Sequence, residues 1–261
     1  MAVDIPSTLS PSKLGKFMSC PLAFRFSYID HLPEPANRAQ LLGTLVHRAL
    51  QLLYAQGEAG DRTPERAIEV LRSAHLEMSD TEEMATLRFD QQESNAFFED
   101  ARSLVTSYFA MEDPGSVQPI GIELDLRVSL DGVELRGIID RLDLLESGDI
   151  VVTDYKTGRS PRSDQSRSRL LGVQFYAYLC EATFGVRPRE VRLLYLKDQV
   201  VIVESPNDQT MRGLKSRALA VWAAIERACE TEDFRPNPTQ LCRFCAFQSL
   251  CPAFQGQNGT A

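Results

Sequence analysis

The stretch IGIELDLRVSLDGVELRGIIDRLDLLESGDIVVTDYK, residues 120–156, decides the fold class of this chain. Apolar and polar residues alternate strictly from Ile120 to Leu130, which is the pattern of a strand with one buried face. Asp131-Gly132 and Ser147-Gly148-Asp149 are turn signals. They divide the stretch into three expected strands, over residues 120–130, 133–145 and 150–156. The sequence therefore predicts three strands joined as a meander.

Helix signals lie on both sides of this stretch. Ser10 before Pro11 predicts a helix start, and Pro21 opens a second short helix. Apolar residues recur at helical spacing from Leu42 to Leu53, which predicts a longer helix. Further helices are expected at about 64–77, 91–111, 170–184 and 208–230, and further strands at 191–196 and 200–204.

This order of elements predicts an α/β protein whose core is a mixed β-sheet flanked by helices. One domain is expected over residues 1–261. Its core would span about 91–205, after a helical N-terminal part at 10–90. The C-terminal segment 208–255 is expected to pack with residues 10–30.

The distribution of charge excludes some classes of protein. A formal net charge of −8 argues against a protein that coats nucleic acid through bulk electrostatics. Residues 156–169 nevertheless have a local net charge of +4, from Lys156, Arg159, Arg162, Arg167 and Arg169 against Asp164. This basic segment either binds a polyanion or is a solvated loop rich in Ser and Arg. The sequence has no phosphate-binding G-x-x-x-x-G-K-[ST] loop, so ATP-driven helicase activity is not expected within the chain.

The sequence also bears on the compartment. No apolar run approaches the roughly 20 residues that a membrane helix needs. Met1–Ser10 lacks the basic-then-apolar layout of a secretory signal. We therefore expect a soluble, cytoplasmic protein without a membrane partner. In that compartment thiols stay reduced, so metal binding is a better use for clustered cysteines than disulfides are.

Two carboxylates and a lysine are expected to meet on the predicted sheet. Asp154 and Lys156 are two residues apart on one strand and so point to the same face. Asp140 lies near the end of the neighbouring strand, and hairpin pairing would bring it beside Asp154. Close carboxylates favour a divalent metal, which suits phosphodiester hydrolysis with Lys156 assisting. A D-x-K triplet alone also fits a surface strand with ordinary Asp and Lys.

Three motifs in order carry a resemblance to a known family. The segments GIIDR (137–141), DYKTG (154–158) and QFYAY (174–178) resemble the G-x-x-D-R, D-x-K-T-G and Q-x-x-x-Y series of RecB-like PD-(D/E)XK nucleases. The resemblance implies a restriction-endonuclease-like fold and a metal-dependent DNA nuclease, acting on single strands or ends as an exonuclease in repair or recombination. It implies catalytic roles for Asp140, Asp154 and Lys156, and nucleic-acid contacts for Gln174, Tyr178, Arg141 and Arg159.

The same resemblance extends to the metal site. His47 closes the segment GTLVH (43–47), which is similar to the family's G-x-x-x-H element and implies an imidazole ligand beside Asp140 and Asp154. The backbone carbonyl of Tyr155 is implied as a further ligand. An imidazole among oxygen ligands favours Mn²⁺ relative to Mg²⁺. Glu123, on the polar side of the first strand, is an additional acidic candidate.

Four cysteines form a second expected site. Cys242, Cys245 and Cys251 follow the spacing C-x2-C-x5-C, and Cys20 stands near the other end of the chain. The spacing alone fits either structural zinc or an iron–sulfur cluster. It resembles the iron–sulfur staple of RecB-like nucleases such as the AddB nuclease domain and CRISPR-associated exonucleases, which implies a structural 4Fe-4S cluster. Cys180 and Cys229 are interpreted as buried apolar residues.

Three functions remain open from the sequence. The leading hypothesis is the metal-dependent nuclease, with DNA as its partner and a helicase or another repair protein as a further one. The second is a non-catalytic binding or scaffold protein with a RecB-like fold. The third is a zinc-stapled nucleic-acid binder that does not hydrolyse its ligand.

Overall fold

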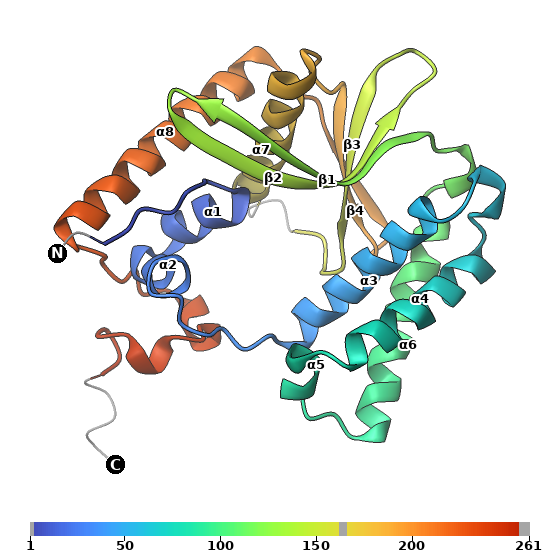
Figure 1. The fold of residues 1–261 in the computed structure, drawn as a ribbon, viewed down its shortest axis with the longest axis horizontal. Helices are drawn as coiled ribbons and strands as arrows, with labels where there is room; N and C mark the ends of the chain where they lie inside the picture. The colour runs from blue at the N-terminus through green and yellow to red at the C-terminus, as the bar shows by residue number, and fades with distance from the viewer. Residues whose placement is uncertain (1–2, 162–165, 256–261) are drawn as a thin grey trace. The chain divides into compact units, whose positions relative to one another are not determined.

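The computed structural model describes residues 3–161 and 166–255, with the backbone alone at 166–170. The helices are α1 (Pro11–Ser19), α2 (Pro21–Tyr28), α3 (Arg38–Ala55), α4 (Pro64–Ser79), α5 (Glu82–Thr86), α6 (Gln91–Phe109), α7 (Ser166–Phe184) and α8 (Asp208–Thr231) (Figure 1). The strands are β1 (Pro119–Leu130), β2 (Val133–Leu144), β3 (Ile150–Lys156), β4 (Glu190–Tyr195) and β5 (Val200–Glu204). Within the described residues they form one sheet in the order β1-β2-β3-β4-β5.

The sheet is mixed. Strands β2 and β3 are antiparallel, with Arg141 opposite Thr153, so that Asp140 follows opposite Asp154. Strands β3 and β4 are parallel, and β4 and β5 are antiparallel. A parallel pair needs a long crossover, and α7 lies in the connection between β3 and β4. The mixed sheet with its helices confirms the predicted α/β class.

Contacts divide the chain into two compact units. The first contains the residues up to Pro35, Arg127–Gly137 and the residues from Asp208 onward. The second contains Ala36–Leu126 and Ile138–Asn207. The single domain expected over 1–261 stays a prediction.

The first unit brings the two ends of the chain together. Helix α1 contacts α8, and Nδ2 of Asn237 donates to the carbonyl of Ser19 at 2.9 Å. The rings of Phe26 and Phe247 pack with centroids 5.3 Å apart. Segments 10–30 and 208–255, which were expected to pack, therefore share one unit.

The second unit has a helical core beside the sheet. Helices α3, α4 and α6 lie side by side and bury one apolar cluster, which also includes Tyr155 of β3 (Figure 1). Capping boxes at Asn37 and Asp90 fix where α3 and α6 begin. Because α3 and β3 contribute to the same core, this packing fixes the position of α3 relative to β3. This arrangement positions His47.

Most elements match the predicted bounds to within two residues, and two helices differ more. The five-residue helix α5, capped by Thr81, was not predicted because it is too short to show helical periodicity. Helix α7 begins at Ser166, earlier than the expected residue 170. Among the described residues, no helix has the length and apolar character needed to cross a membrane.

Candidate metal centre

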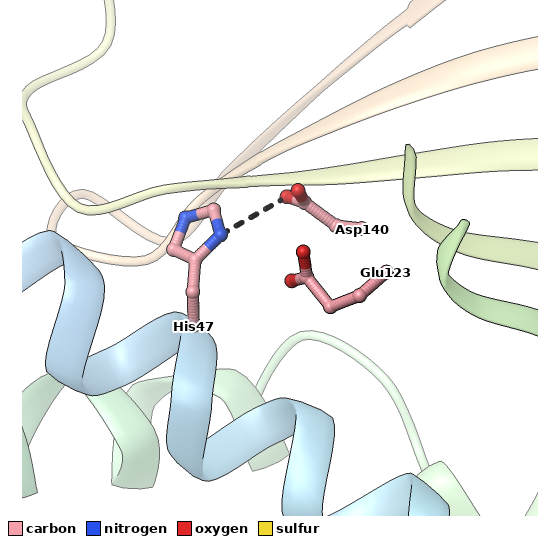
Figure 2. Close-up of side chains that lie close together, drawn as sticks. All are labelled: His47, Glu123 and Asp140. Carbon is pink, nitrogen blue, oxygen red and sulfur yellow. Dashed lines mark ion pairs between the residues drawn. The ribbon is translucent and has the colours of Figure 1, made fainter. Parts of the chain in front are cut away.

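Three side chains from three elements converge in the second unit. Figure 2 shows His47 of α3, Glu123 of β1 and Asp140 of β2 pointing toward one another. One ligand atom from each lies within 4.8 Å of the others. One imidazole and two carboxylates at this spacing are a suitable donor set for Mn²⁺ or Mg²⁺. The residues present therefore fit a divalent metal.

Both ring nitrogens of His47 are engaged. Nε2 lies 3.0 Å from the carbonyl oxygen of Tyr155, and because a carbonyl only accepts, Nε2 carries the proton. Nδ1 lies 3.4 Å from Oδ2 of Asp140. Burial acts to lower the pKa of His47, but the hydrogen bond and charge of Asp140 raise it above the ordinary value. In the neutral tautomer, Nδ1 turns its lone pair toward the carboxylates, as a metal-binding histidine does.

Tyr155 supports the centre through its backbone. Its N–H donates to Oδ2 of Asp140 at 2.7 Å, and its carbonyl accepts from His47. The carbonyl oxygen keeps a second lone pair. Its role as a metal ligand stays a prediction.

Glu123 lies at an irregular point of β1. Its φ of +47° is in the left-handed region, which costs a non-glycine residue roughly 1–2 kcal/mol. A Cβ on Gly121 would lie 3.1 Å from the side chain of Leu124, so these residues, three apart, share one side of the strand. In a regular strand they would point to opposite faces. The irregularity acts as a β-bulge that turns Glu123 toward Asp140.

Asp154 and Lys156 form a pair beside this centre. Asp154 is 3% exposed, and burial raises its pKa to about 6. Its Oδ2 lies 2.5 Å from Nζ of Lys156, and apart from this ion pair that buried oxygen has no hydrogen-bond partner among the described residues. Burial acts to lower the pKa of Lys156, but the charge of Asp154 raises it, so the ammonium is retained. A buried carboxylate oxygen with one cation is suited to accept a second.

Tyr176 of α7 is a site residue that the sequence motifs did not single out. Burial raises the pKa of its hydroxyl, and the charges of Asp154, Asp140 and Glu123 raise it further. The pKa of Tyr176 is therefore coupled to the charges of all three carboxylates. Its position two residues after Gln174 in the QFYAY segment was the signal that could have identified it.

Gly43 allows the DYKTG segment to approach α3. A Cβ at this position would lie 3.3 Å from Oγ1 of Thr157. Beyond Thr157, the backbone N–H of Ser160 donates to Oδ2 of Asp198 at 2.6 Å. These two contacts fix both ends of the residues that follow Lys156.

Comparison with known proteins identifies the family of the chain. A model of the PD-(D/E)XK nuclease superfamily matches residues 8–252. The chain belongs to this superfamily. It is 32% identical over 141 residues to the Gene 69 protein of Mycobacterium phage L5, covering 51% of this chain and 45% of that protein. It is 25% identical to the Gene 69 protein of Mycobacterium phage D29, covering 94% of this chain and 97% of that one.

Two further similarities concern named nucleases. The chain is 28% identical over 187 residues to an ATP-dependent helicase/deoxyribonuclease subunit of Streptococcus mutans, covering 68% of this chain and 16% of that protein. The crystal structure of the "Putative exonuclease" from Eubacterium rectale matches with a TM-score of 0.54 and 13% identity, over 98% of this chain and 90% of that one. The second likeness shows the fold. The predicted RecB-like resemblance is confirmed by the superfamily match and by the helicase/deoxyribonuclease relative.

In this PD-(D/E)XK chain, Arg141 does not face nucleic acid. Its side chain is 1% exposed and hydrogen bonded to neighbouring acids and hydroxyls. The prediction that Arg141 contacts nucleic acid is therefore wrong. Arg141 follows Asp140 along β2, so strand alternation turns it to the opposite face of the sheet.

The other predicted nucleic-acid contacts are placed as follows. Arg159 is exposed, Gln174 is half-buried, and Tyr178 is 8% exposed. Their roles stay predictions. Residue Arg162 of the basic segment lies outside the described residues, as do the side chains of Arg167 and Arg169.

The four cysteines lie in the first unit of the chain. Cys20 separates α1 from α2, and Cys242, Cys245 and Cys251 lie in or beside the short 3-10 helices Gln240–Phe244 and Gln248–Leu250. All four line one cavity of about 140 Å³. Among the described residues, no three of their sulfurs lie within 4.8 Å of one another. Cys180 and Cys229 are buried, as interpreted from the sequence.

Proposed function

We propose that the chain is a metal-dependent DNA nuclease that acts on single strands or ends as an exonuclease in repair or recombination. The observation that carries the proposal is the convergence of His47, Glu123 and Asp140 next to the ion pair of the buried Asp154 with Lys156. An acidic cluster alone is common, but a cluster with an imidazole and an adjacent lysine suits phosphodiester hydrolysis.

Each side chain has a distinct role in this proposal. Asp140, His47, Glu123 and Asp154 hold the metal, with the carbonyl of Tyr155 as a further oxygen donor. When bound, Mn²⁺ or Mg²⁺ supplies a polarised phosphate and a water of lowered pKa. Lys156 retains its proton beside Asp154 and so presents positive charge where phosphate charge develops.

The relatives support the choice of DNA and of a partner. One relative is named as a helicase/deoxyribonuclease subunit, and one structural neighbour is named as an exonuclease. The chain spans a small part of the helicase/deoxyribonuclease relative, and the ATP-dependent helicase activity belongs to that named protein. We therefore include a helicase among the partners proposed for this chain.

The four cysteines that line one cavity of about 140 Å³ support a metal group bound there. Among the described residues, no three of their sulfurs lie within 4.8 Å of one another. The resemblance of their spacing to the iron–sulfur staple of RecB-like nucleases favours a cluster over a single zinc ion. We propose a structural 4Fe-4S cluster held by Cys20, Cys242, Cys245 and Cys251.

A cleavage assay tests the proposed activity. The purified full chain is incubated with end-labelled single- and double-stranded DNA, with Mn²⁺, with Mg²⁺ or with a chelator. The expected result is metal-dependent shortening from one end, and the labelled ends give the polarity. Absence of cleavage by the wild-type chain with either metal would support the scaffold alternative. Retained cleavage by both Lys156→Ala and Asp154→Ala would exclude the assigned centre.

Metal analysis tests the proposed cluster. Protein prepared without oxygen is expected to be brown and to contain iron with acid-labile sulfide. A colourless protein with one zinc per chain would contradict the cluster.

A further inference from the structure

Behind the candidate metal centre lies a buried polar network around Arg141. The Arg141 side chain is 1% exposed, and its guanidinium donates to Oδ1 of Asp143 at 2.8 Å and to Oε2 of Glu112 at 3.1 Å. It also donates to the hydroxyls of three tyrosines, at 2.7 Å to Tyr54, 2.8 Å to Tyr108 and 2.7 Å to Tyr155. One cation therefore ties together residues from α3, α6, β2 and β3.

The network is expensive to bury if its only role is stability. Removing an arginine and two carboxylates from water is unfavourable for each ion, and apolar residues of similar volume often stabilise a fold equally well. A fully hydrogen-bonded network in a low-dielectric interior instead fixes geometry strongly. Arg141 therefore fixes the relative positions of the residues that it joins.

Tyr155 connects the network to the metal centre. Its hydroxyl accepts from Arg141, whereas its backbone N–H and carbonyl hold Asp140 and His47. The residue is 3% exposed, so its ring cannot shift without disturbing the core. Any displacement of the Tyr155 ring is passed to a backbone that contacts two of the proposed ligands.

The network also holds the helix that carries His47. Tyr54 lies seven residues after His47 on α3, two helical turns along nearly the same face. Its hydroxyl is bound to Arg141 of β2. The guanidinium thus links α3 to β2 at a point two helical turns beyond His47.

We propose that Arg141 is a positioning residue, which through Tyr155 and Tyr54 holds His47 and Asp140 at the separation that the divalent metal requires. This inference rests on the proposed function. It adds a positioning network on the face of the sheet opposite to the metal centre. Groups that orient metal ligands typically change metal affinity or activity by about 10–100-fold when altered.

The decisive variant is Tyr155→Phe, which removes one hydroxyl and keeps the ring and the backbone. We expect the Mn²⁺ concentration that gives half-maximal cleavage to rise about 10-fold, with an unchanged KM for DNA. Arg141→Lys keeps the charge but loses the planar fork, and its effect should be larger. Tyr28→Phe removes a hydroxyl in the first unit and serves as the matched control. Leu214→Ala, on the buried face of α8 in the first unit, controls for lost stability.

A metal-free measurement separates this inference from the proposed activity. In NMR spectra of the full chain, the ring signals of His47 should shift in Tyr155→Phe and stay in place in Tyr28→Phe and Leu214→Ala. Unchanged His47 signals and unchanged Mn²⁺ dependence in folded Tyr155→Phe would overturn the positioning role. A wild-type chain that neither binds Mn²⁺ nor cleaves DNA would overturn the proposed function and with it the metal requirement assigned to the network.

Discussion

The metal centre and the cysteine cavity are built in different ways. In the centre, hydrogen bonds and ion pairs within the protein already join the functional groups: Tyr155 to Asp140, His47 to Tyr155, and Lys156 to Asp154. The cysteines lie on short turns and line a cavity. The sheet and the Arg141 network hold the first site without a metal. In our proposal, the second site depends on the cluster that it binds. Removal of the divalent metal should therefore abolish cleavage and leave the fold stable, whereas removal of the cluster should destabilise the fold.

The largest expected effect comes from substitutions that disable the metal centre alone. Asp140→Asn and Lys156→Ala should each lower the rate of DNA cleavage by about 10³-fold, because Asp140 is a proposed ligand of the metal and Lys156 supplies positive charge where the phosphate charge develops. The unfolding temperature should change little, since the Lys156 side chain is 42% exposed and Asp140→Asn keeps the size of the side chain and an oxygen that accepts the N–H of Tyr155. Single-turnover cleavage and thermal melts measure the two quantities. Asp80→Asn, at the exposed end of α4, is the control, and equal losses in that variant would remove the assignment.

The next largest effect comes from a substitution that disables the cysteine site alone. Cys242→Ala should lower the unfolding temperature by about 5–15 °C, because loss of a link between chain ends costs a few kcal/mol and each kcal/mol is worth about 2–4 °C at this size. Chelation of the divalent metal should leave the temperature nearly unchanged. Cys180→Ala, which removes a buried thiol outside the cavity, should keep its iron. Equal iron content in Cys242→Ala and the wild type would contradict the staple.

A smaller effect sharpens the comparison at Glu123, where backbone strain and a proposed ligand coincide. Glu123→Gly should stabilise the fold by about 1 kcal/mol, because glycine accepts a φ of +47° without strain. The half-saturating Mn²⁺ concentration should rise about 10-fold in the same variant. Glu123→Gln keeps the strain and should show the metal effect without the stabilisation. A Gly variant less stable than the Gln variant would mean that the bulge carries no strain.

The smallest effect concerns substrate binding at the exposed Arg159. Arg159→Ala should raise the dissociation constant for single-stranded DNA about three-fold and reduce the salt slope of binding by about 0.7, the loss of one phosphate contact. Binding titrations over a range of salt concentrations would show it. An unchanged slope would assign Arg159 to the solvated loop that its composition also allows.

The two-residue alternation of side chains along a strand predicted much of the metal centre. Alternation placed Asp154 and Lys156 on one face, and the hairpin register brought Asp140 opposite. The same rule also turns Arg141 away from Asp140, and the motif-based assignment of Arg141 to nucleic acid went against it.

Other features depend on tertiary context. Glutamate rarely adopts a positive φ, so the alternating pattern of β1 gave no sign of the bulge at Glu123. Tyr176 lies in a largely apolar helix, and the effect of the carboxylate charges on its pKa depends on tertiary structure. The four cysteines were identified by spacing, but their shared cavity needed the packing of the first unit.

The most direct test of the account is the position of a metal ion. Anomalous diffraction from crystals of the wild-type chain with Mn²⁺ should show a peak bounded by His47, Glu123 and Asp140, with Asp154 next to it, and Asp140→Asn crystals should lose that peak. A Mn²⁺ peak elsewhere in the wild type, or the same peak in Asp140→Asn, would contradict the proposed metal centre.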